Sequence, residues 1–159
     1  SAISISLLEL KVQSFMSDVK DRKTTYVLDE QIGYILRLAN QRHAGIFQST
    51  ITKNLTPTQF AVLMRLSERG ELSQNLLGRL VALDTATTKG VVDRLKAKDL
   101  VQSRPDTFDK RRTIISLTKS GLSIIDTLRN DGTRITEATL SKLKTAEKHR
   151  LLGLLRKIV

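Results

Sequence analysis

Cysteine is absent from the 159 residues, which excludes a disulfide scaffold, a thiolate metal site and a cysteine nucleophile. Tryptophan is absent too, and other aromatic residues are few. No apolar run approaches the roughly 20 residues that a membrane-spanning helix needs. The N-terminal stretch SAISISLLELKVQSF lacks the basic region and the sustained apolar region of a secretory signal. We therefore expect a cytoplasmic protein without a membrane partner.

Patterns typical of catalysis and of metal binding are also missing. The only two histidines, His43 and His149, lie far apart in the chain. The sequence contains no glycine-rich phosphate loop and no group of residues with metal-ligand spacing. We expect neither an enzyme nor a protein that needs a metal or another cofactor.

Negative charge is in short supply. The 27 Lys and Arg residues outnumber the 16 Asp and Glu residues, which gives a net charge of +11 at pH 7. Such an excess favours a polyanionic partner, either nucleic acid or an anionic membrane surface. Charge alone leaves a second explanation open, namely a basic surface that keeps the protein soluble by self-repulsion.

A strong helical period begins at Leu28, after an N-terminal extension (residues 1–27) that we expect to be partly helical or flexible. Apolar residues recur at steps of three and four as far as Phe47, which predicts one long helix with a single apolar stripe. Such a helix is too long for a small domain to cover by itself. We expect it to pack partly against a second subunit.

Three helix start signals follow. Thr56-Pro57-Thr58-Gln59 combines an N-cap, a proline at the first helical position and a capping box, and this helix should stop near Gly70. Ser73 should cap a third helix, and Asp84 a fourth that runs to about Lys98. Two short helices joined by so tight a turn indicate a helix-turn-helix.

The first turns of the fourth helix are rich in hydroxyl groups. Thr85, Thr87, Thr88 and Lys89 cluster there, although threonine is a poor helix former. Such a cluster is suited to contacts with phosphates and base edges. The alternative is a weak helix start that only meets solvent.

A charged hairpin comes next. The runs Leu100–Arg104 and Arg112–Leu117 are rich in strand-forming residues and flank the turn PDTFDKR. The tip carries Asp106, Asp109, Lys110 and Arg111.

Amphipathic helices close the chain. Thr118 should cap a helix through Leu128, and the leucines between Leu140 and Ile158 predict one last amphipathic helix. Its basic residues are explained better by a solvated face than by a second nucleic-acid site.

The order of a long helix, three shorter helices, a hairpin and terminal helices resembles the MarR family of bacterial transcriptional regulators. The resemblance rests on Val92-Asp93-Arg94-Leu95, Lys98, Leu100-Val101 and Arg104, and on Asp109-Lys110-Arg111 followed by Leu117-Thr118. It covers roughly residues 28–159. Asp99 departs from the family pattern, which usually has glycine after the recognition helix, but a left-handed cap tolerates aspartate.

The resemblance implies a mainly α fold with a small β-hairpin wing, a winged helix-turn-helix. Residues 56–118 would bind DNA, and residues 28–55 and 119–159 would interlock two copies into a homodimer. Two-fold symmetry then implies a palindromic operator with the fourth helix of each copy in a major groove. Arg111, held by Asp109, would enter the minor groove, and Lys110, Arg94 and Arg112 would also contact DNA, the last two as phosphate clamps.

The resemblance also suggests a small effector. Many such regulators, mostly repressors, release DNA when a small aromatic carboxylate or phenol binds between the dimer helices and the winged helix. His43 interrupts an apolar stripe with Arg42 and Tyr34 nearby, and Phe60 and Met64 come from the helix expected to face it. A histidine satisfied by a backbone carbonyl in the core or interface is the structural alternative. A constitutive architectural DNA-binding protein is the alternative function.

Overall fold

The computed structural model describes residues 26–159, which divide into two compact units, 26–39 and 40–159. The first unit holds the short helix η1 (Leu28–Glu30) and the first turns of α2 (Ile32–Thr50). Residues 1–25 of the expected N-terminal extension lie outside the described residues. The long helix predicted from the apolar stripe is therefore present, and it starts four residues later than the stripe does.

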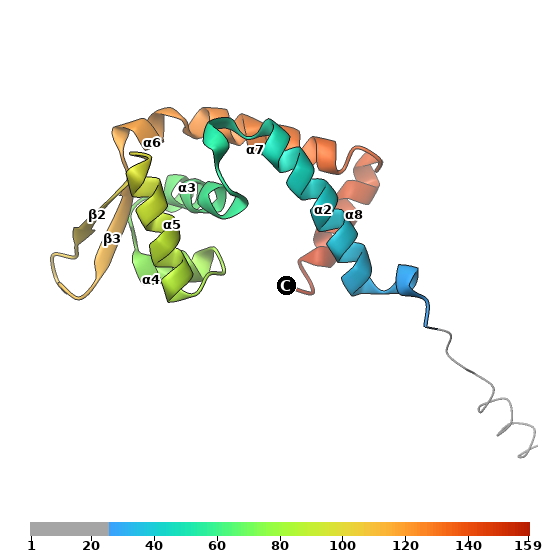
Figure 1. The fold of residues 1–159 in the computed structure, drawn as a ribbon, viewed down its shortest axis with the longest axis horizontal. Coiled ribbons are helices and arrows are strands. Elements are labelled where there is room, and N and C mark those ends of the chain that lie inside the picture. The colour runs from blue at the N-terminus through green and yellow to red at the C-terminus, as the bar shows by residue number, and fades with distance from the viewer. Residues whose placement is uncertain (1–25) are drawn as a thin grey trace, which may run out of the picture. The chain divides into compact units, whose positions relative to one another are not determined.

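The second unit contains the remaining elements, most of which are labelled in Figure 1. In chain order they are η2 (Thr52–Asn54), α3 (Pro57–Arg69), β1 (Leu72–Ser73), α4 (Gln74–Leu80), α5 (Thr85–Ala97), β2 (Val101–Pro105), β3 (Thr113–Leu117), α6 (Lys119–Ser123), α7 (Ile125–Thr139) and α8 (Thr145–Leu155). Helices α4 and α5 lie side by side, and the β2–β3 hairpin extends next to them (Figure 1). This arrangement is a winged helix-turn-helix.

The hairpin predicted from the sequence is confirmed, and it belongs to a three-stranded antiparallel sheet in the order β1-β3-β2. Val101 pairs with Leu117, and Pro105 pairs with Thr113 next to the tip. The third strand is the link after α3, in which Leu72 pairs with Ile115. Two residues are too few to show the alternation that identifies a strand in a sequence.

The predicted capping groups are in place. Thr56 Oγ1 accepts from the backbone N–H of Gln59 at 3.2 Å, and the Gln59 side chain accepts from the N–H of Thr56 at 3.1 Å. The hydroxyls of Ser73 and Thr118 accept from backbone N–H groups at the starts of α4 and α6. These bonds satisfy helix donors that would otherwise lack a partner.

The second residue after α5 adopts the left-handed conformation expected there. Asp99 has φ +55°. Its carbonyl accepts from the Thr118 hydroxyl at 2.6 Å, and its carboxylate accepts from the Ser120 hydroxyl at 2.8 Å. These bonds compensate for the steric cost of a side chain in this conformation.

The prediction of one last helix from Leu140 is wrong. Helix α7 extends to Thr139, and α8 begins only at Thr145. Leu140 and Leu143 lie in the turn between them, where the N–H of Leu143 donates to the carbonyl of Leu140 at 3.0 Å. The start signal is Glu147, whose side chain accepts from the N–H of Lys144 at 2.7 Å, and the leucine pattern hid this boundary.

The hydrophobic core joins the winged helix to α7. Leu63 and Leu66 of α3, Val92 and Leu95 of α5, and Ile115 of β3 are buried in it. Helix α7 adds Ile125, Leu128 and Ile135 to the same cluster. Part of the segment expected to serve dimerisation therefore completes the core of the winged helix.

The connection from α2 to α3 is an unusual turn held from two sides. Lys53 and Asn54 both have positive φ, at 66° and 49°. The buried carboxylate of Asp131 accepts from the N–H of Thr52 at 2.8 Å, and the ammonium of Lys98 donates to the carbonyls of Lys53 and Asn54 at 3.1 and 3.0 Å. Helices α7 and α5 thus both fix the turn.

Two regions, residues 26–39 and the C-terminal helix α8, leave apolar side chains exposed to solvent. In residues 26–39 the exposed apolar side chains are Tyr26, Val27, Leu28, Ile32, Ile35, Leu36 and Leu38. Helix α8, which lies wholly within the described residues, has no buried residue, and Leu154 and Ile158 near its end are exposed. Amphipathic helices whose apolar residues face water lack a packing partner within the single chain.

The buried bond between α7 and the turn yields a stability prediction. Replacing Asp131→Ala leaves the N–H of Thr52 without its acceptor, and we expect the free energy of unfolding to fall by about 1–3 kcal/mol. Chemical denaturation measures this. Asp126→Ala, an exposed carboxyl on the same helix, is the control, and we expect it to change the free energy by less than about 0.5 kcal/mol. Equal free energies of unfolding for the two variants would contradict a stabilising role of the bond between Asp131 and Thr52.

Candidate nucleic-acid interface and effector site

The start of α5 is fixed by its capping aspartate. Asp84 Oδ1 accepts from the N–H of Thr87 at 2.7 Å, and Oδ2 accepts from the Thr87 hydroxyl at 2.8 Å. These bonds from Thr87, the backbone one first, lower the pKa of the Asp84 carboxyl below its usual value of 3.8. Thr85 and Thr87 are exposed at this end of the helix, where the N–H groups attract anions.

Thr88 is not available to DNA, which corrects the sequence prediction. Its side chain is 1% exposed, and its hydroxyl donates to the carbonyl of Asp84 at 2.7 Å. A Cβ atom on Gly78 of α4 would lie only 2.5 Å from that hydroxyl oxygen. Thr88 therefore packs α5 against α4, and this contact depends on a glycine that belongs to a different helix.

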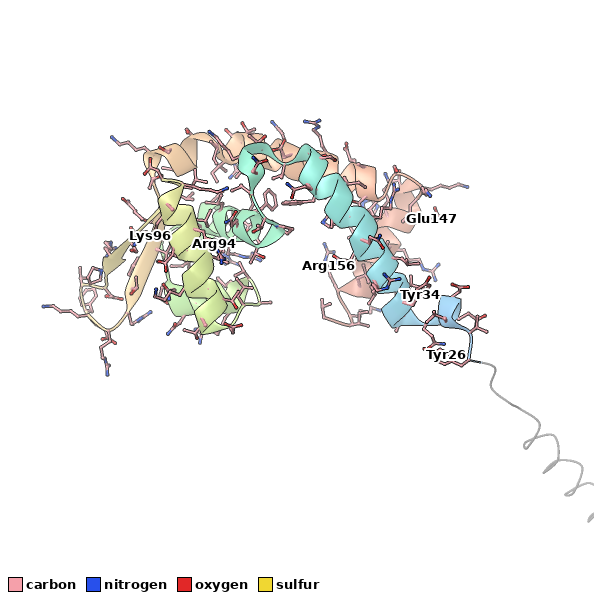
Figure 2. All side chains as sticks on the ribbon, viewed as in Figure 1. Tyr26, Tyr34, Arg94, Lys96, Glu147 and Arg156 are labelled. Atoms are coloured by element: carbon pink, nitrogen blue, oxygen red, sulfur yellow. The ribbon has the colours of Figure 1, made fainter. Side chains whose placement is uncertain are left out.

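The exposed face of α5 continues with charged residues. The ammonium of Lys89 lies 2.9 Å from the carboxylate of Asp93, one turn further along. This hydrogen bond from Lys89 lowers the pKa of the Asp93 carboxyl. Arg94 and Lys96 come from the C-terminal half of the helix (Figure 2). Lys96 donates to the hydroxyl of Ser103 on β2 at 2.9 Å, so it also links the helix to the wing.

The wing tip presents an arginine that an aspartate orients. Nε and Nη2 of Arg111 donate to the two carboxylate oxygens of Asp109 at 3.1 and 3.3 Å, and the arginine side chain is 91% exposed. The side-chain bond from Arg111, followed by its backbone bond, lowers the pKa of Asp109. Lys110 is exposed beside it, and Arg112 Nε lies 3.9 Å from Asp106. The arginine is thus held in one orientation while it stays open to a ligand.

Helix α4 supplies three polar residues that the sequence reasoning missed. Gln74, Asn75 and Arg79 line a hollow of about 290 Å³ together with Arg111, Arg112 and Thr113. The same three residues also line a second hollow next to Asp84 and Thr85. They therefore lie between the start of α5 and the wing. The available signal was their common position on the outer face of a short helix whose Leu77 points inward.

The expected effector residues fall into three places. Arg42 donates to the carbonyl of Ala138 at 3.2 Å and to the hydroxyl of Ser141 at 3.3 Å. His43 Nδ1 lies 3.0 Å from the hydroxyl of Thr139, so this histidine has a side-chain partner in place of the backbone carbonyl that the structural alternative assumed. These bonds join α2 to the end of α7.

Phe60 and Met64 line an open hollow of about 660 Å³ between α3 and α7, with Arg129 and Gly132 among the other lining residues. The rings of Phe60 and Phe47 meet edge to face with centroids 5.9 Å apart, and Phe47 in turn lies 6.3 Å from the ring of His43. The ring of Phe47 thus lies between the ring of His43 and that of Phe60, which lines this hollow. Tyr34 belongs to the other unit, where the Arg37 guanidinium lies 5.2 Å from the centre of its ring (Figure 2).

Sequence comparisons place these features among known proteins. A sequence model described as the MarR family matches residues 55–113, from the start of α3 to the wing. The transcriptional repressor NicR of Pseudomonas putida is 41% identical over 137 residues, which cover 86% of this chain and 87% of NicR. The chain belongs to the MarR family. It is accordingly a DNA-binding transcriptional regulator of the MarR type.

Two solved structures extend the likeness beyond the winged helix. A probable transcriptional regulator from Pseudomonas aeruginosa is 44% identical, with a TM-score of 0.81 over 84% of this chain and all of that one. BpsR of Bordetella bronchiseptica, whose DNA binding is regulated by 6-hydroxynicotinic acid, is 38% identical, with a TM-score of 0.79 over 84% of this chain and 96% of BpsR. The MarR-type fold therefore holds for most of the chain.

Two features are absent from the part of the chain that the structure describes. None of the helices in residues 26–159 is long and apolar enough to cross a membrane. Within the same residues, no three Asp, Glu, His or Cys side chains are grouped so that they could hold a metal ion.

The Asp84 cap gives a pH prediction. The folded state lowers the pKa of this carboxyl below 3.8, so its stabilisation is complete above pH 3.8 and is lost as the pH falls through the lowered value. We expect Asp84→Ala to melt at a lower temperature than wild type near neutral pH, and the difference to shrink in acid. Thermal melts followed by circular dichroism at several pH values measure it. If the difference in melting temperature persisted unchanged in acid, the charge on Asp84 would contribute nothing to stability.

Proposed function

We propose that this MarR-family chain is a homodimeric repressor that binds a palindromic operator and releases it when a small aromatic acid binds. Residues 56–118 bind DNA, and residues 28–55 and 119–159 form the dimer, although α7 also completes the core. The carrying observation is the orientation of Arg111, an exposed guanidinium fixed by Asp109 at the tip of the wing.

The DNA-binding surface combines two kinds of contact. Thr85, Thr87 and Lys89 enter the major groove from the start of α5, while Arg111 enters the minor groove from the wing. The residues in contact with phosphates are Gln74, Asn75, Arg79, Arg94, Lys110 and Arg112. Lys89 exchanges its exposed pair with Asp93 for a phosphate at little cost, because an exposed ion pair of this kind stabilises the fold only slightly.

A second copy of the chain provides the partner that the exposed apolar residues lack. Ile32, Ile35 and Leu36 on α2 are exposed in the single chain, and so are Leu154 on α8 and Ile158 just after it. Burying such residues in an isologous interface removes apolar area from water, which favours association. Two-fold symmetry then presents two recognition helices to two half-sites of the operator.

The effector hypothesis rests on the bonds between α2 and α7 and on the relatives. BpsR responds to 6-hydroxynicotinic acid, an aromatic carboxylate. Arg42 and His43 offer a cation and an imidazole to a carboxylate, and Phe60 and Met64 offer apolar cover to a ring. A ligand that takes over Arg42 and His43 competes with their bonds to the end of α7, and so favours a different helix arrangement.

A constitutive architectural DNA-binding protein is the second candidate. It would use the same basic winged helix without choosing among sequences. Selection from a randomised duplex library about three helical turns long separates the two candidates, because only a regulator enriches a palindrome with half-sites about one turn apart. Enrichment of no sequence would favour the architectural protein.

The wing assignment predicts a large effect of a single arginine. We expect Arg111→Ala to bind the selected duplex about ten- to a hundredfold more weakly, and to reduce the slope of log affinity against log salt by about 1 if the guanidinium also neutralises a phosphate. The melting temperature should not change, because the side chain is exposed. Fluorescence anisotropy over a range of salt concentrations measures both effects.

Lys119→Ala is the matched control for this experiment. It removes one positive charge from α6, which lies at the other end of β3 from the wing tip (Figure 1). We expect operator affinity close to that of wild type. If Arg111→Ala and Lys119→Ala lost the same operator affinity, net charge would explain the effect and the position of Arg111 on the wing would not.

The effector site predicts a response to an aromatic carboxylate. We expect 6-hydroxynicotinic acid to raise the melting temperature and to weaken operator binding, because a ligand stabilises the conformation that it prefers. The matched hydroxypyridine, which lacks the carboxylate, should leave both the melting temperature and operator binding unchanged. His43→Ala should bind operator normally and lose the response.

Thr139→Val separates a ligand contact from a structural role of His43, because it removes the same hydrogen bond and leaves the imidazole in place. If Thr139→Val keeps the response to 6-hydroxynicotinic acid and His43→Ala loses it, the result supports a direct contact between His43 and the ligand. Loss of the dimer in His43→Ala would contradict it and favour an interface histidine.

A further inference from the structure

Phe108 is the most exposed of the aromatic residues for which the structure shows a side chain. Its side chain is 99% exposed at the wing tip, whereas Phe47 and Phe60 pack edge to face against each other. Single apolar residues on a surface are common, so exposure alone assigns no role. Position, rigidity and charged neighbours provide the further evidence.

Hydrogen bonds hold the loop that carries Phe108. The N–H of Phe108 donates to the carboxylate of Asp106 at 2.9 Å. The N–H of Asp106 donates to the carbonyl of Arg112 at 2.9 Å, and the N–H of Arg112 donates to the carbonyl of Asp109 at 2.9 Å. The carboxylate of Asp109 accepts from the N–H of Arg111 at 3.1 Å. The loop therefore holds the backbone at Phe108 in a defined conformation, which reduces the entropy lost on binding.

The charges around the ring favour a polyanion as the partner. Asp106 lies 3.9 Å from Arg112, and Asp109 accepts from Arg111, so both carboxylates of the loop face a cation. Lys110 adds a further exposed positive charge. An apolar protein surface would have to desolvate these cations, whereas DNA supplies phosphates for them.

The minor groove fits this combination of one ring and adjacent cations. Proteins that enter the minor groove often insert an apolar side chain at a base step, next to arginines that read the narrow groove. Such insertion partly unstacks the step, and pyrimidine–purine steps yield most easily. Phe108 lies three residues before Arg111 on the same short loop.

We propose that Phe108 is a specificity-determining residue that acts as an apolar wedge at a base step in the minor groove under the wing. The ring selects deformable steps, and Arg111 supplies the electrostatic attraction. This inference rests on the proposed function, because it needs DNA in contact with the wing. It adds sequence preference at positions where the major-groove residues make no contact.

The test uses the duplex that the wild-type protein selects from a randomised library, with aminopurine placed at the step under the wing. We expect wild-type protein to raise the aminopurine fluorescence, because unstacking removes its quenching. Phe108→Ala should abolish this rise and weaken binding about tenfold. The slope of log affinity against log salt should not change, since no charge is lost, in contrast to Arg111→Ala.

Phe108→Leu is the matched variant, because it keeps an apolar side chain without the aromatic ring. It should retain most of the affinity and part of the fluorescence rise. Thr107→Ala, a neighbouring change on the same exposed loop, should behave as wild type. The ring is fully exposed, so all variants should melt at the wild-type temperature.

Failure of this inference can be told apart from failure of the proposed function. If wild-type protein selects a palindrome that Phe108→Ala binds as tightly and with the same sequence preferences, the result contradicts the proposal that Phe108 acts as a wedge. That outcome leaves the proposed function as a regulator intact. If the affinity falls but wild type leaves the aminopurine fluorescence unchanged, the ring does not enter the stack, and the wedge is also wrong. If wild type selects no sequence, the proposed function fails, and the inference fails with it.

Discussion

The recognition helix depends on one close contact, between the hydroxyl of Thr88 and the backbone of α4 at Gly78. The hydroxyl is already bonded to the carbonyl of Asp84, so it cannot move away. Any side chain at Gly78 would overlap it. Because this contact sets how α5 packs against α4, it also decides that Thr85 and Thr87 face outward while Thr88 faces inward. The set of α5 side chains that we propose for contact with DNA is thus a consequence of packing between two helices.

Aspartates orient the exposed cations of the interface. Asp109 holds Arg111, and Asp93 holds Lys89, each through a bond that is open to solvent. Such bonds are weak in water, so a phosphate or a base edge can replace them without a large penalty. They still restrict the side chains, which lowers the entropic cost of binding. The net charge of +11 adds a long-range attraction that salt screens.

For the coupling that we propose between an effector and DNA, the turn between α2 and α3 offers a physical route. The turn is bonded to Asp131 of α7 and to Lys98 at the end of α5. Arg42 and His43 bond to the other end of α7. A rearrangement of α2 against α7 therefore acts on the same turn that Lys98 ties to the recognition helix. Packed elements with two discrete arrangements transmit such changes better than flexible links do.

The sequence by itself determined the features that are local in the chain. Helix caps at Thr56, Ser73 and Asp84 depend on bonds over three residues, and Asp109 bonds to Arg111 over two residues. Periodicity located the long helix and the hairpin strands. These signals were sufficient for a helix-turn-helix followed by a hairpin, and the family came from the resemblance of the motif residues.

Only the tertiary structure decided the features that need two distant segments. The burial of Thr88 depends on Gly78, and the short strand at Leu72 exists because β3 lies beside it. The role of α7 in the core and the break before α8 were hidden because apolar residues at helical spacing look alike whether they meet the core, a partner or a turn. Periodicity shows which face of a helix is apolar, but what covers that face is decided by residues far away in the chain.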